Sequence, residues 1–284
     1  MAVSNPPVQP VLVLLSHPVS GNPTQYMMEK ALAHHQLDWR YLSLDVSPEN
    51  IEDAIRGIRA MGFSGGHCAD PHKQTVPALL DRLTEKAEMI GAVNLIFREE
   101  DELVGDNTEG QGFIESLRRM TDPAEKKVVL LGAGRMARAV GVELAAADVA
   151  EITIANRDPS PARDLAKLLA EKFQVGSSAV QWEEDFELPA EIDLLINATS
   201  IGHEDPDARV PLNLESLSGE TIVADVTTDP PRTPLLGEAA QCGCRTLDGL
   251  SMYIDQVAAG FKLWTGVEPD LTVMREAIEE FLEV

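Results

Sequence analysis

The sequence predicts an α/β fold with two domains: an N-terminal α/β substrate domain and a Rossmann-type, doubly wound dinucleotide-binding domain. Strand-like and helix-like patterns alternate through residues 11–104. A fully apolar run at 127–131 leads directly into Gly132-Ala133-Gly134 and a helical pattern, which is half of a βαβ unit. Later apolar runs at 192–196 and 222–226 are typical of buried parallel strands.

The first domain is expected to span residues 1–106. Ser47, Pro48 and Glu49 mark the start of one of its helices, with a hydroxyl N-cap, proline at the first helical position and an acid in the first turn. The expected elements are strands at 11–15 and 41–46, helices at 24–35, 51–60 and 77–89, and a strand pair at 93–98 and 103–104.

The dinucleotide domain is expected to span residues 107–248. Its expected elements are strands at 127–131, 152–155, 192–196 and 222–226, and helices at 135–147 and 162–173. Two more helical patterns, at 252–264 and 271–282, follow the last expected strand. We expect residues 249–284 to pack back on the first domain.

Composition and charge exclude several classes of partner. The apolar runs fall short of the roughly 20 residues that span a bilayer, and no secretory signal precedes residue 11, so we expect a cytoplasmic protein without a membrane partner. A net charge of −24 opposes binding to nucleic acid. Cys68, Cys242 and Cys244 are expected to be reduced thiols, and no metal site is expected, because Cys242 and Cys244 lack a second pair of ligands with suitable spacing.

The segment Gly132-Ala133-Gly134-Arg135-Met136-Ala137 has the form G-x-G-x-x-A between a predicted strand and a predicted helix. The first glycine permits a tight turn and the second allows the backbone to approach a pyrophosphate, which the helix N-terminus attracts. This context predicts binding of NAD or NADP rather than a purely structural turn.

Asn156-Arg157-Asp158 ends the next predicted strand, where the adenosine ribose lies in such domains. Arg157 favours the 2′-phosphate of NADP, whereas Asp158 would repel it and accept hydrogen bonds from a free ribose hydroxyl. Because like charges in a partly buried site are costly, we expect NAD to be used at least as well as NADP. A solvated surface turn is the alternative.

A series of short motifs runs along nearly the whole chain. They are Pro71-His72-Lys73, Gly91-Ala92-Val93-Asn94, Gly105-Asp106-Asn107-Thr108, Gly112-Phe113, Gly132-Ala133-Gly134, Asn156-Arg157, Asn197-Ala198-Thr199-Ser200, Asp225-Val226, Thr233-Pro234-Leu235-Leu236, Asp248-Gly249-Leu250, Met252, Gln256 and Trp264-Thr265-Gly266. In these motifs and in their order the chain resembles the shikimate/quinate dehydrogenase family.

The resemblance implies that Lys73 and Asp106 form the catalytic pair beside the reacting hydroxyl. Hydride transfer requires the hydroxyl proton to leave, and a lysine near a carboxylate can accept and return it. The residues that the resemblance places on the substrate are Asn22, Thr24, His67, Asn94, Thr228 and Gln256, and those that it adds to the cofactor site are Thr199, Gly249 and Met252. Thr24 has an alternative role as the N-cap of the helix that follows it.

Some residues depart from the family pattern where the family contacts its substrate. His67 replaces the usual Asn, Ala69 and Leu95 replace Thr, and Thr228 replaces Tyr. Unpaired buried substrate hydroxyls would cost roughly 1–3 kcal/mol each, so a changed substrate preference is expected. His67 is expected to take over a hydrogen bond to the substrate and to tune its preference by titrating near neutral pH.

The resulting hypothesis is reversible, NAD- or NADP-dependent oxidation of a ring hydroxyl on shikimate, quinate or a related ring acid, such as an amino-substituted analogue. By resemblance, this reaction belongs to aromatic amino acid biosynthesis. The alternative is a protein that binds or senses such a metabolite without converting it. A monomer and a homodimer both remain open.

Overall fold

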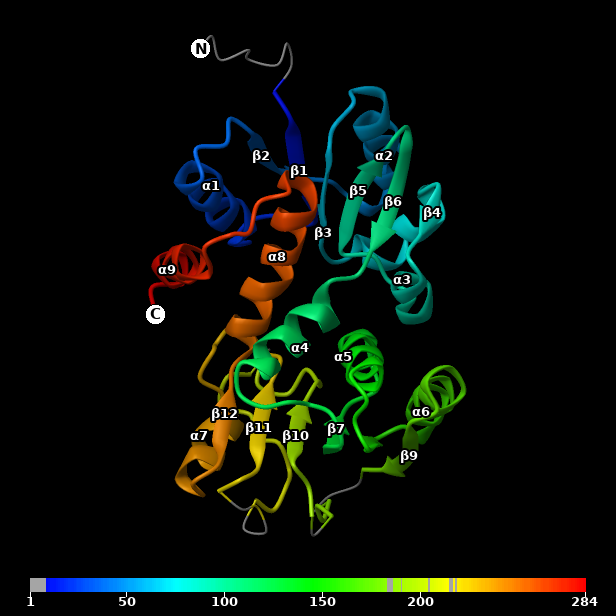
Figure 1. Cartoon of the computed structure of the whole chain (residues 1–284), viewed down its shortest axis with the longest axis vertical. Coiled ribbons are helices and arrows are strands. Elements are labelled where there is room, and N and C mark those ends of the chain that lie inside the picture. The colour runs from blue at the N-terminus through cyan, green and yellow to red at the C-terminus, as the bar shows by residue number, and fades with distance from the viewer. Residues whose placement is uncertain (1–8, 183–185, 190, 204, 215–216, 218) are drawn as a thin grey trace. The chain divides into compact units, whose positions relative to one another are not determined.

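The computed structural model describes the chain except for residues 1–8, 183–185, 190, 204, 215–216 and 218. The chain divides into two compact units (Figure 1). Unit 1 comprises Met1–Thr108 and Val257–Val284, and unit 2 comprises Glu109–Gln256. The sequence suggested boundaries at 106 and 248. In the structure the second boundary follows Gln256 instead of residue 248, because helix α8 (Gly249–Thr265) begins in unit 2 and ends in unit 1.

Unit 1 contains a mixed sheet with the strand order β2-β1-β3-β5-β6-β4. Neighbouring strands are parallel except at β3·β5 and β5·β6. Helices α1 and α9 lie side by side (Figure 1). Besides the end of α8, the elements are β1 (Val11–Ser16), α1 (Thr24–His34), β2 (Arg40–Asp45), η1 (Pro48–Asn50), α2 (Ile51–Ala60), β3 (Gly65–Cys68), η2 (His72–Gln74), η3 (Val76–Leu79), β4 (Arg82–Leu83), α3 (Glu85–Ile90), β5 (Leu95–Glu99), β6 (Glu102–Asp106) and α9 (Leu271–Leu282).

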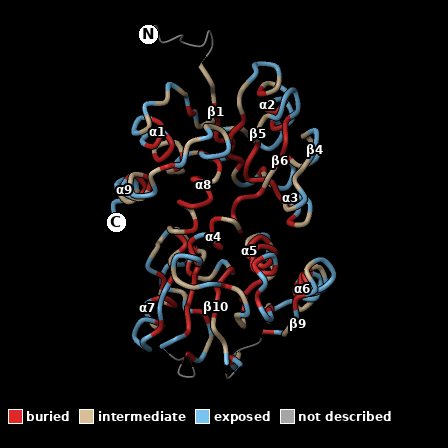
Figure 2. Tube along the Cα trace, viewed as in Figure 1, coloured by how far each residue is buried: buried red, intermediate tan, exposed pale blue. Residues whose placement is uncertain are grey.

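Both faces of the unit 1 sheet are covered, which explains why β1 is continuously apolar. Val13 and Leu15 pack in one core cluster with residues of α2. Leu12 and Leu14, which point to the other face of the strand, are also completely or almost completely buried. Figure 2 shows β1 as buried and α2 as a mixture of buried and exposed positions.

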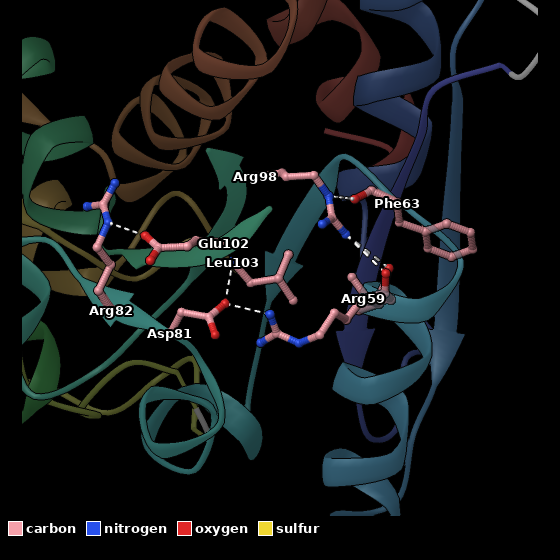
Figure 3. Close-up of polar contacts among 8 residues, drawn as sticks. Arg59, Phe63, Asp81, Arg82, Arg98, Glu102 and Leu103 are labelled. Carbon is pink, nitrogen blue, oxygen red and sulfur yellow. Dashed lines mark hydrogen bonds and ion pairs between the residues drawn. The ribbon is translucent and has the colours of Figure 1, made fainter. Parts of the chain in front are cut away.

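Two predictions about the helices between β2 and β5 are wrong. The helix expected at 77–89 is interrupted, because the Asp81 carboxylate accepts hydrogen bonds from the Leu103 N–H at 2.7 Å and from Arg59 at 2.6 Å (Figure 3). Thr84 then caps the short helix α3. In addition, Ser47 makes no capping bond to a long helix: Pro48–Asn50 is a separate 3₁₀ turn, and α2 begins at Ile51.

Unit 2 contains an all-parallel sheet with the order β12-β11-β10-β7-β8-β9. This is the strand order of a doubly wound sheet, the architecture that the sequence predicts. Besides the start of α8, its elements are α4 (Glu109–Arg118), β7 (Lys127–Leu131), α5 (Arg135–Ala146), β8 (Glu151–Asn156), α6 (Pro159–Phe173), β9 (Gly176–Gln181), β10 (Leu194–Asn197), β11 (Ile222–Asp225), α7 (Pro234–Gln241) and β12 (Arg245–Leu247).

The unit 2 sheet also has two covered faces. Val129 and Leu131 of β7 pack in one core cluster with Leu235 of α7, while Leu130 approaches Gly141 of α5. The turn after β7 therefore lies at the carboxyl edge of a buried strand, where doubly wound folds bind their ligands. None of the helices in the described part of the chain has the length and apolarity that a membrane span needs.

Candidate functional site

The glycine turn of unit 2 connects β7 to α5. Gly132 has a φ of +99°, and a side chain there would meet the Ala198 carbonyl oxygen at 2.7 Å, so the turn requires glycine. Gly134 is the N-cap of α5, and a Cβ there would have nothing within 4 Å. The open space beside Gly134 lets another molecule approach the backbone and the N-terminus of α5.

A cavity of about 680 Å³ lies at this turn. Six of the residues predicted to bind the cofactor line it: Gly132, Ala133, Gly134, Asn156, Arg157 and Thr199. The other lining residues are Trp182, Ala198, Ser200, Ile201 and Pro211. Trp182 immediately follows β9, and its indole N–H donates to the Pro211 carbonyl at 3.3 Å, which holds the ring in place.

The remaining predicted cofactor residues do not line this cavity. Arg135 and Met136 lie in the first turn of α5. A side chain at Gly249 would meet the Thr227 carbonyl oxygen at 2.3 Å, so Gly249 serves close packing of the backbone. Met252 is buried, with 2% of its surface exposed.

Asp158 has a structural role in the turn after β8. It is the N-cap of α6, and its Oδ1 accepts a hydrogen bond from the Ser160 N–H at 2.9 Å. The Asn156 side chain donates to the Asp158 carbonyl at 2.8 Å and holds the turn. The negative charge of Asp158 is therefore directed at the helix N-terminus, and the cavity wall of this turn is formed by Asn156 and Arg157.

A network of polar bonds holds the loop after β10, which contributes Thr199 to the cavity lining. Asn197 accepts hydrogen bonds from the Thr199 N–H at 3.2 Å and the Thr199 hydroxyl at 2.7 Å, and donates to Asp225 at 3.1 Å. Asp225 also accepts from the Thr233 hydroxyl at 2.9 Å. This network fixes the loop that follows β10, because the two bonds to Asp225 are buried from water.

In unit 1, the two candidate catalytic residues are tied to one short segment. The Val93 N–H donates to the Lys73 carbonyl at 2.8 Å, and the Asn94 N–H donates to the Asp106 carbonyl at 3.1 Å. Asp106 Oδ1 accepts from the Thr84 hydroxyl at 2.5 Å and the Asn107 N–H at 2.8 Å. The carboxylate is thus held in one orientation at the end of β6.

The ammonium of Lys73 has a carboxylate partner that the sequence did not indicate. Lys73 Nζ lies 3.6 Å from Asp70 Oδ2, and 18% of the lysine side chain is exposed. That Asp106 orients the lysine stays a prediction, and Asp70 is a second carboxylate near the ammonium. The signal in the sequence that could have suggested this ion pair is that Asp70 and Lys73 are three residues apart.

The candidate substrate residues of unit 1 form local bonds of their own. Asn94 Oδ1 accepts from the Thr108 N–H at 2.8 Å and its Nδ2 donates to the Thr108 hydroxyl at 3.1 Å. Asn22 Oδ1 accepts from the Thr24 hydroxyl at 2.6 Å and the Thr24 N–H at 3.0 Å. Thr24 is the first residue of α1 and Pro23 is its N-cap, so the alternative role of Thr24 as N-cap is wrong. Asn22 supplies the capping oxygen instead.

His67 lies in the core of unit 1. Its Nδ1 is hydrogen-bonded to the Tyr41 hydroxyl at 2.7 Å, and its ring packs edge-on against Trp264. Burial lowers the pKa of His67 to about 3. The expectation that His67 titrates near neutral pH is therefore wrong, because an imidazolium in this core would lose its hydration.

Two other departures from the family pattern, Leu95 and Thr228, lie in different units. Leu95 is completely buried, and its side chain faces Gly260 of α8 within the core of unit 1. Thr228 follows β11 and Gln256 lies in α8, both in unit 2. Sequence reasoning missed Trp182 and Pro211 because they lie outside the family motifs and beside none of the predicted strands.

The fold of unit 2 and its glycine-turn cavity define a Rossmann-type α/β protein. Three family models match the chain: the shikimate dehydrogenase substrate binding domain over residues 14–96, the shikimate / quinate 5-dehydrogenase model over 115–206, and the shikimate 5′-dehydrogenase C-terminal domain over 249–279. The shikimate dehydrogenase (NADP(+)) of Methanopyrus kandleri is 40% identical and covers 96% of both chains.

Two solved structures extend this comparison. Ligand-free 5-ketofructose reductase of Gluconobacter sp. strain CHM43 is 44% identical with a TM-score of 0.93, over 97% of this chain and 99% of that one. Shikimate 5-dehydrogenase from Listeria monocytogenes, in complex with shikimate and NAD, is 27% identical with a TM-score of 0.88, and the match covers 98% of this chain and 99% of that one. The chain belongs to the shikimate/quinate dehydrogenase family.

Proposed function

We propose that this protein catalyses reversible oxidation of a secondary alcohol with NAD or NADP, with shikimate and quinate as the first substrates to test. The observation that carries the proposal is the cavity at Gly132–Gly134, in a chain that is 40% identical to a named shikimate dehydrogenase over nearly its full length. The named relatives use NADP or are found with NAD.

In this reaction the alcohol carbon gives a hydride to NAD(P)⁺ and the hydroxyl gives up its proton, so the products are a ketone, NAD(P)H and a proton. Lys73 is the group that accepts this proton and returns it in the reverse direction. The carboxylate of Asp106 keeps one orientation during the reaction, because it accepts hydrogen bonds from Thr84 and Asn107.

The residues around the cavity fit a dinucleotide. Backbone at the glycine turn and the N-terminus of α5 suits a pyrophosphate, and Arg157 suits a 2′-phosphate. Because Asp158 is directed at the N-terminus of α6, its repulsion of that phosphate is reduced. We therefore expect NADP to be used at least as well as NAD, which reverses the expectation from sequence.

A second candidate function is reduction of a polyhydroxy ketone. The observation that favours it is the 44% identity and TM-score of 0.93 with a 5-ketofructose reductase. Both functions use the same hydride and proton transfer, and they differ in whether the substrate carries a carboxylate.

The test is a panel that follows absorbance of the reduced nicotinamide. Shikimate and quinate are oxidised with NAD⁺ and NADP⁺, and 5-ketofructose is reduced with NADH and NADPH. Turnover in at least one arm is expected, and it must vanish in Lys73→Ala. A protein that binds a panel member by calorimetry without turnover in any arm would be the non-catalytic alternative.

A further inference from the structure

Asp70 lies beside the candidate catalytic lysine. Its Oδ2 is 3.6 Å from Lys73 Nζ, and 58% of its side chain is exposed. Its backbone carbonyl accepts from the Ser16 hydroxyl at 3.1 Å and from the His17 N–H at 3.3 Å. These bonds fix the Asp70 backbone at the carboxyl end of β1 while leaving its carboxylate beside Lys73.

This edge of the unit 1 sheet carries other acidic groups. Asp45 ends β2, next to β1, and lies 2.9 Å from His17 Nδ1. Asp106 ends β6 and is tied through Asn94 to the same segment that binds the Lys73 carbonyl. The positive charge of Lys73 is thus shared with Asp70 in an acidic neighbourhood, and a bound anion would meet the Asp70 charge as well.

The polar side chains at the start of α1 do not add a positive charge there. The Thr24 hydroxyl donates to Asn22 Oδ1 at 2.6 Å, and Thr24 is only 3% exposed. Its hydroxyl proton is therefore engaged in this pair. A carboxylate ligand would need donors or cations to replace its water, at a cost that grows as it leaves solvent.

We propose that Asp70 is a specificity-determining residue that makes the site prefer an uncharged polyhydroxylated alcohol or ketone over the corresponding carboxylate. This inference rests on the proposed dehydrogenase function and on Lys73 as its proton-transfer group. A substrate carboxylate that bound about 4 Å from the Asp70 carboxylate would be repelled by about 1 kcal/mol even at the dielectric constant of water, which corresponds to about a fivefold change.

The test compares shikimate with its methyl ester, which has the same ring and no charge. The wild-type protein should have a kcat/KM for the ester at least equal to that for the acid. Asp70→Asn should raise the ratio of kcat/KM for shikimate to kcat/KM for the ester about fivefold. The ratio is the measure because Asp70 pairs with Lys73, so any change in proton transfer affects both substrates alike. Asp38→Asn is the matched control, because the Asp38 side chain is also exposed (54%) and also pairs with a cation, Arg40. Asp38 precedes β2, so it lies at the end of that strand opposite to Asp45.

The proposal is overturned if the wild-type protein strongly prefers shikimate and Asp70→Asn leaves the ratio of the two substrates unchanged. Absence of turnover with either compound, together with inactivity on 5-ketofructose, would instead contradict the proposed function. In that case, the role of Asp70 is tested by the dissociation constants of shikimate and the ester, measured by calorimetry. Equal effects of Asp70→Asn on both constants would reject Asp70 as the determinant, whereas tighter binding of shikimate alone would support it.

Discussion

Asp158 shows how the direction of one carboxylate decides a cofactor prediction. Because its Oδ1 caps α6, Asp158→Ala should lower the free energy of unfolding by about 0.5–2 kcal/mol and change the ratio of NADP to NAD use only slightly. Asp158→Ser, which can still cap, should recover most of the stability. Arg157→Ala should reduce kcat/KM with NADP more than with NAD.

Denaturant unfolding and steady-state kinetics with both cofactors check these expectations. A large shift toward NADP in Asp158→Ala, without loss of stability, would show that the carboxylate faces the ribose as the sequence first suggested.

His67 predicts a dependence of stability on pH. Its Nε2 is buried without a hydrogen-bond partner among the described residues, and burial lowers its pKa to about 3. The unfolded chain takes up this proton below about pH 6.5, whereas the folded protein does not until about pH 3. Stability should therefore fall as pH falls through this window, by up to about 1.4 kcal/mol per pH unit from this residue.

Urea unfolding at several pH values between 4 and 7 tests this expectation, with His67→Asn as the comparison. The variant should show a shallower decline, because an asparagine takes up no proton. Parallel curves for the two proteins would mean that His67 is solvated in the folded state.

At the scale of elements, the contact between α4 and α8 in unit 2 depends on Gly112. A Cβ there would meet the Met252 carbonyl oxygen at 2.4 Å and the Gln256 nitrogen at 2.6 Å, both backbone atoms. Gly112→Ala should therefore force the helices apart and destabilise the protein by about 1–3 kcal/mol. Gly237→Ala, in α7, is the matched control: nothing lies within 4 Å of its added Cβ, so it should be neutral or stabilising by up to about 1 kcal/mol.

Thermal and denaturant unfolding of the two alanine variants separates a packing effect from the general effect of alanine in a helix. Equal stability of Gly112→Ala and Gly237→Ala would contradict the close approach of α4 and α8.

The elements that could be predicted are those whose signal is local. The strands β7, β10 and β11 are apolar because both sheet faces are covered, so composition alone locates them. The strand β3 was missed because its glycines are required by neighbours: a Cβ at Gly66 would meet the Val13 carbonyl oxygen at 2.1 Å. The edge strands β9 and β12 lack a long apolar run.

The same distinction holds for the site. The glycine turn was predictable because strand, turn and helix are contiguous in sequence. The Lys73–Asp70 pair and the Asp158 cap depend on side-chain directions, which spacing alone does not determine. Trp182 and Pro211 meet at the cavity from separate loops, so only the folded chain brings them together.

For the whole molecule, a net charge of −24 predicts that stability rises with salt. Between about 0.01 M and about 1 M salt the Debye length falls from about 30 to about 3 Å, which screens repulsion among the many carboxylates. The exposed ion pairs, such as Lys30–Glu280, are weakened as well, but such pairs contribute little. Tm should therefore increase from low to high NaCl, and a decrease would mean that ion pairs outweigh the repulsion.

Proton transfer by Lys73 in an NAD(P)-dependent alcohol oxidation is tested most directly by the turnover number of Lys73→Ala, measured with the best substrate of the panel. The variant should bind NADP like the wild-type protein and lose at least about 100-fold in kcat with a smaller change in KM. Lys86→Ala, on α3, controls for loss of a lysine from unit 1. A near-normal kcat in Lys73→Ala would contradict its assignment as the proton-transfer group.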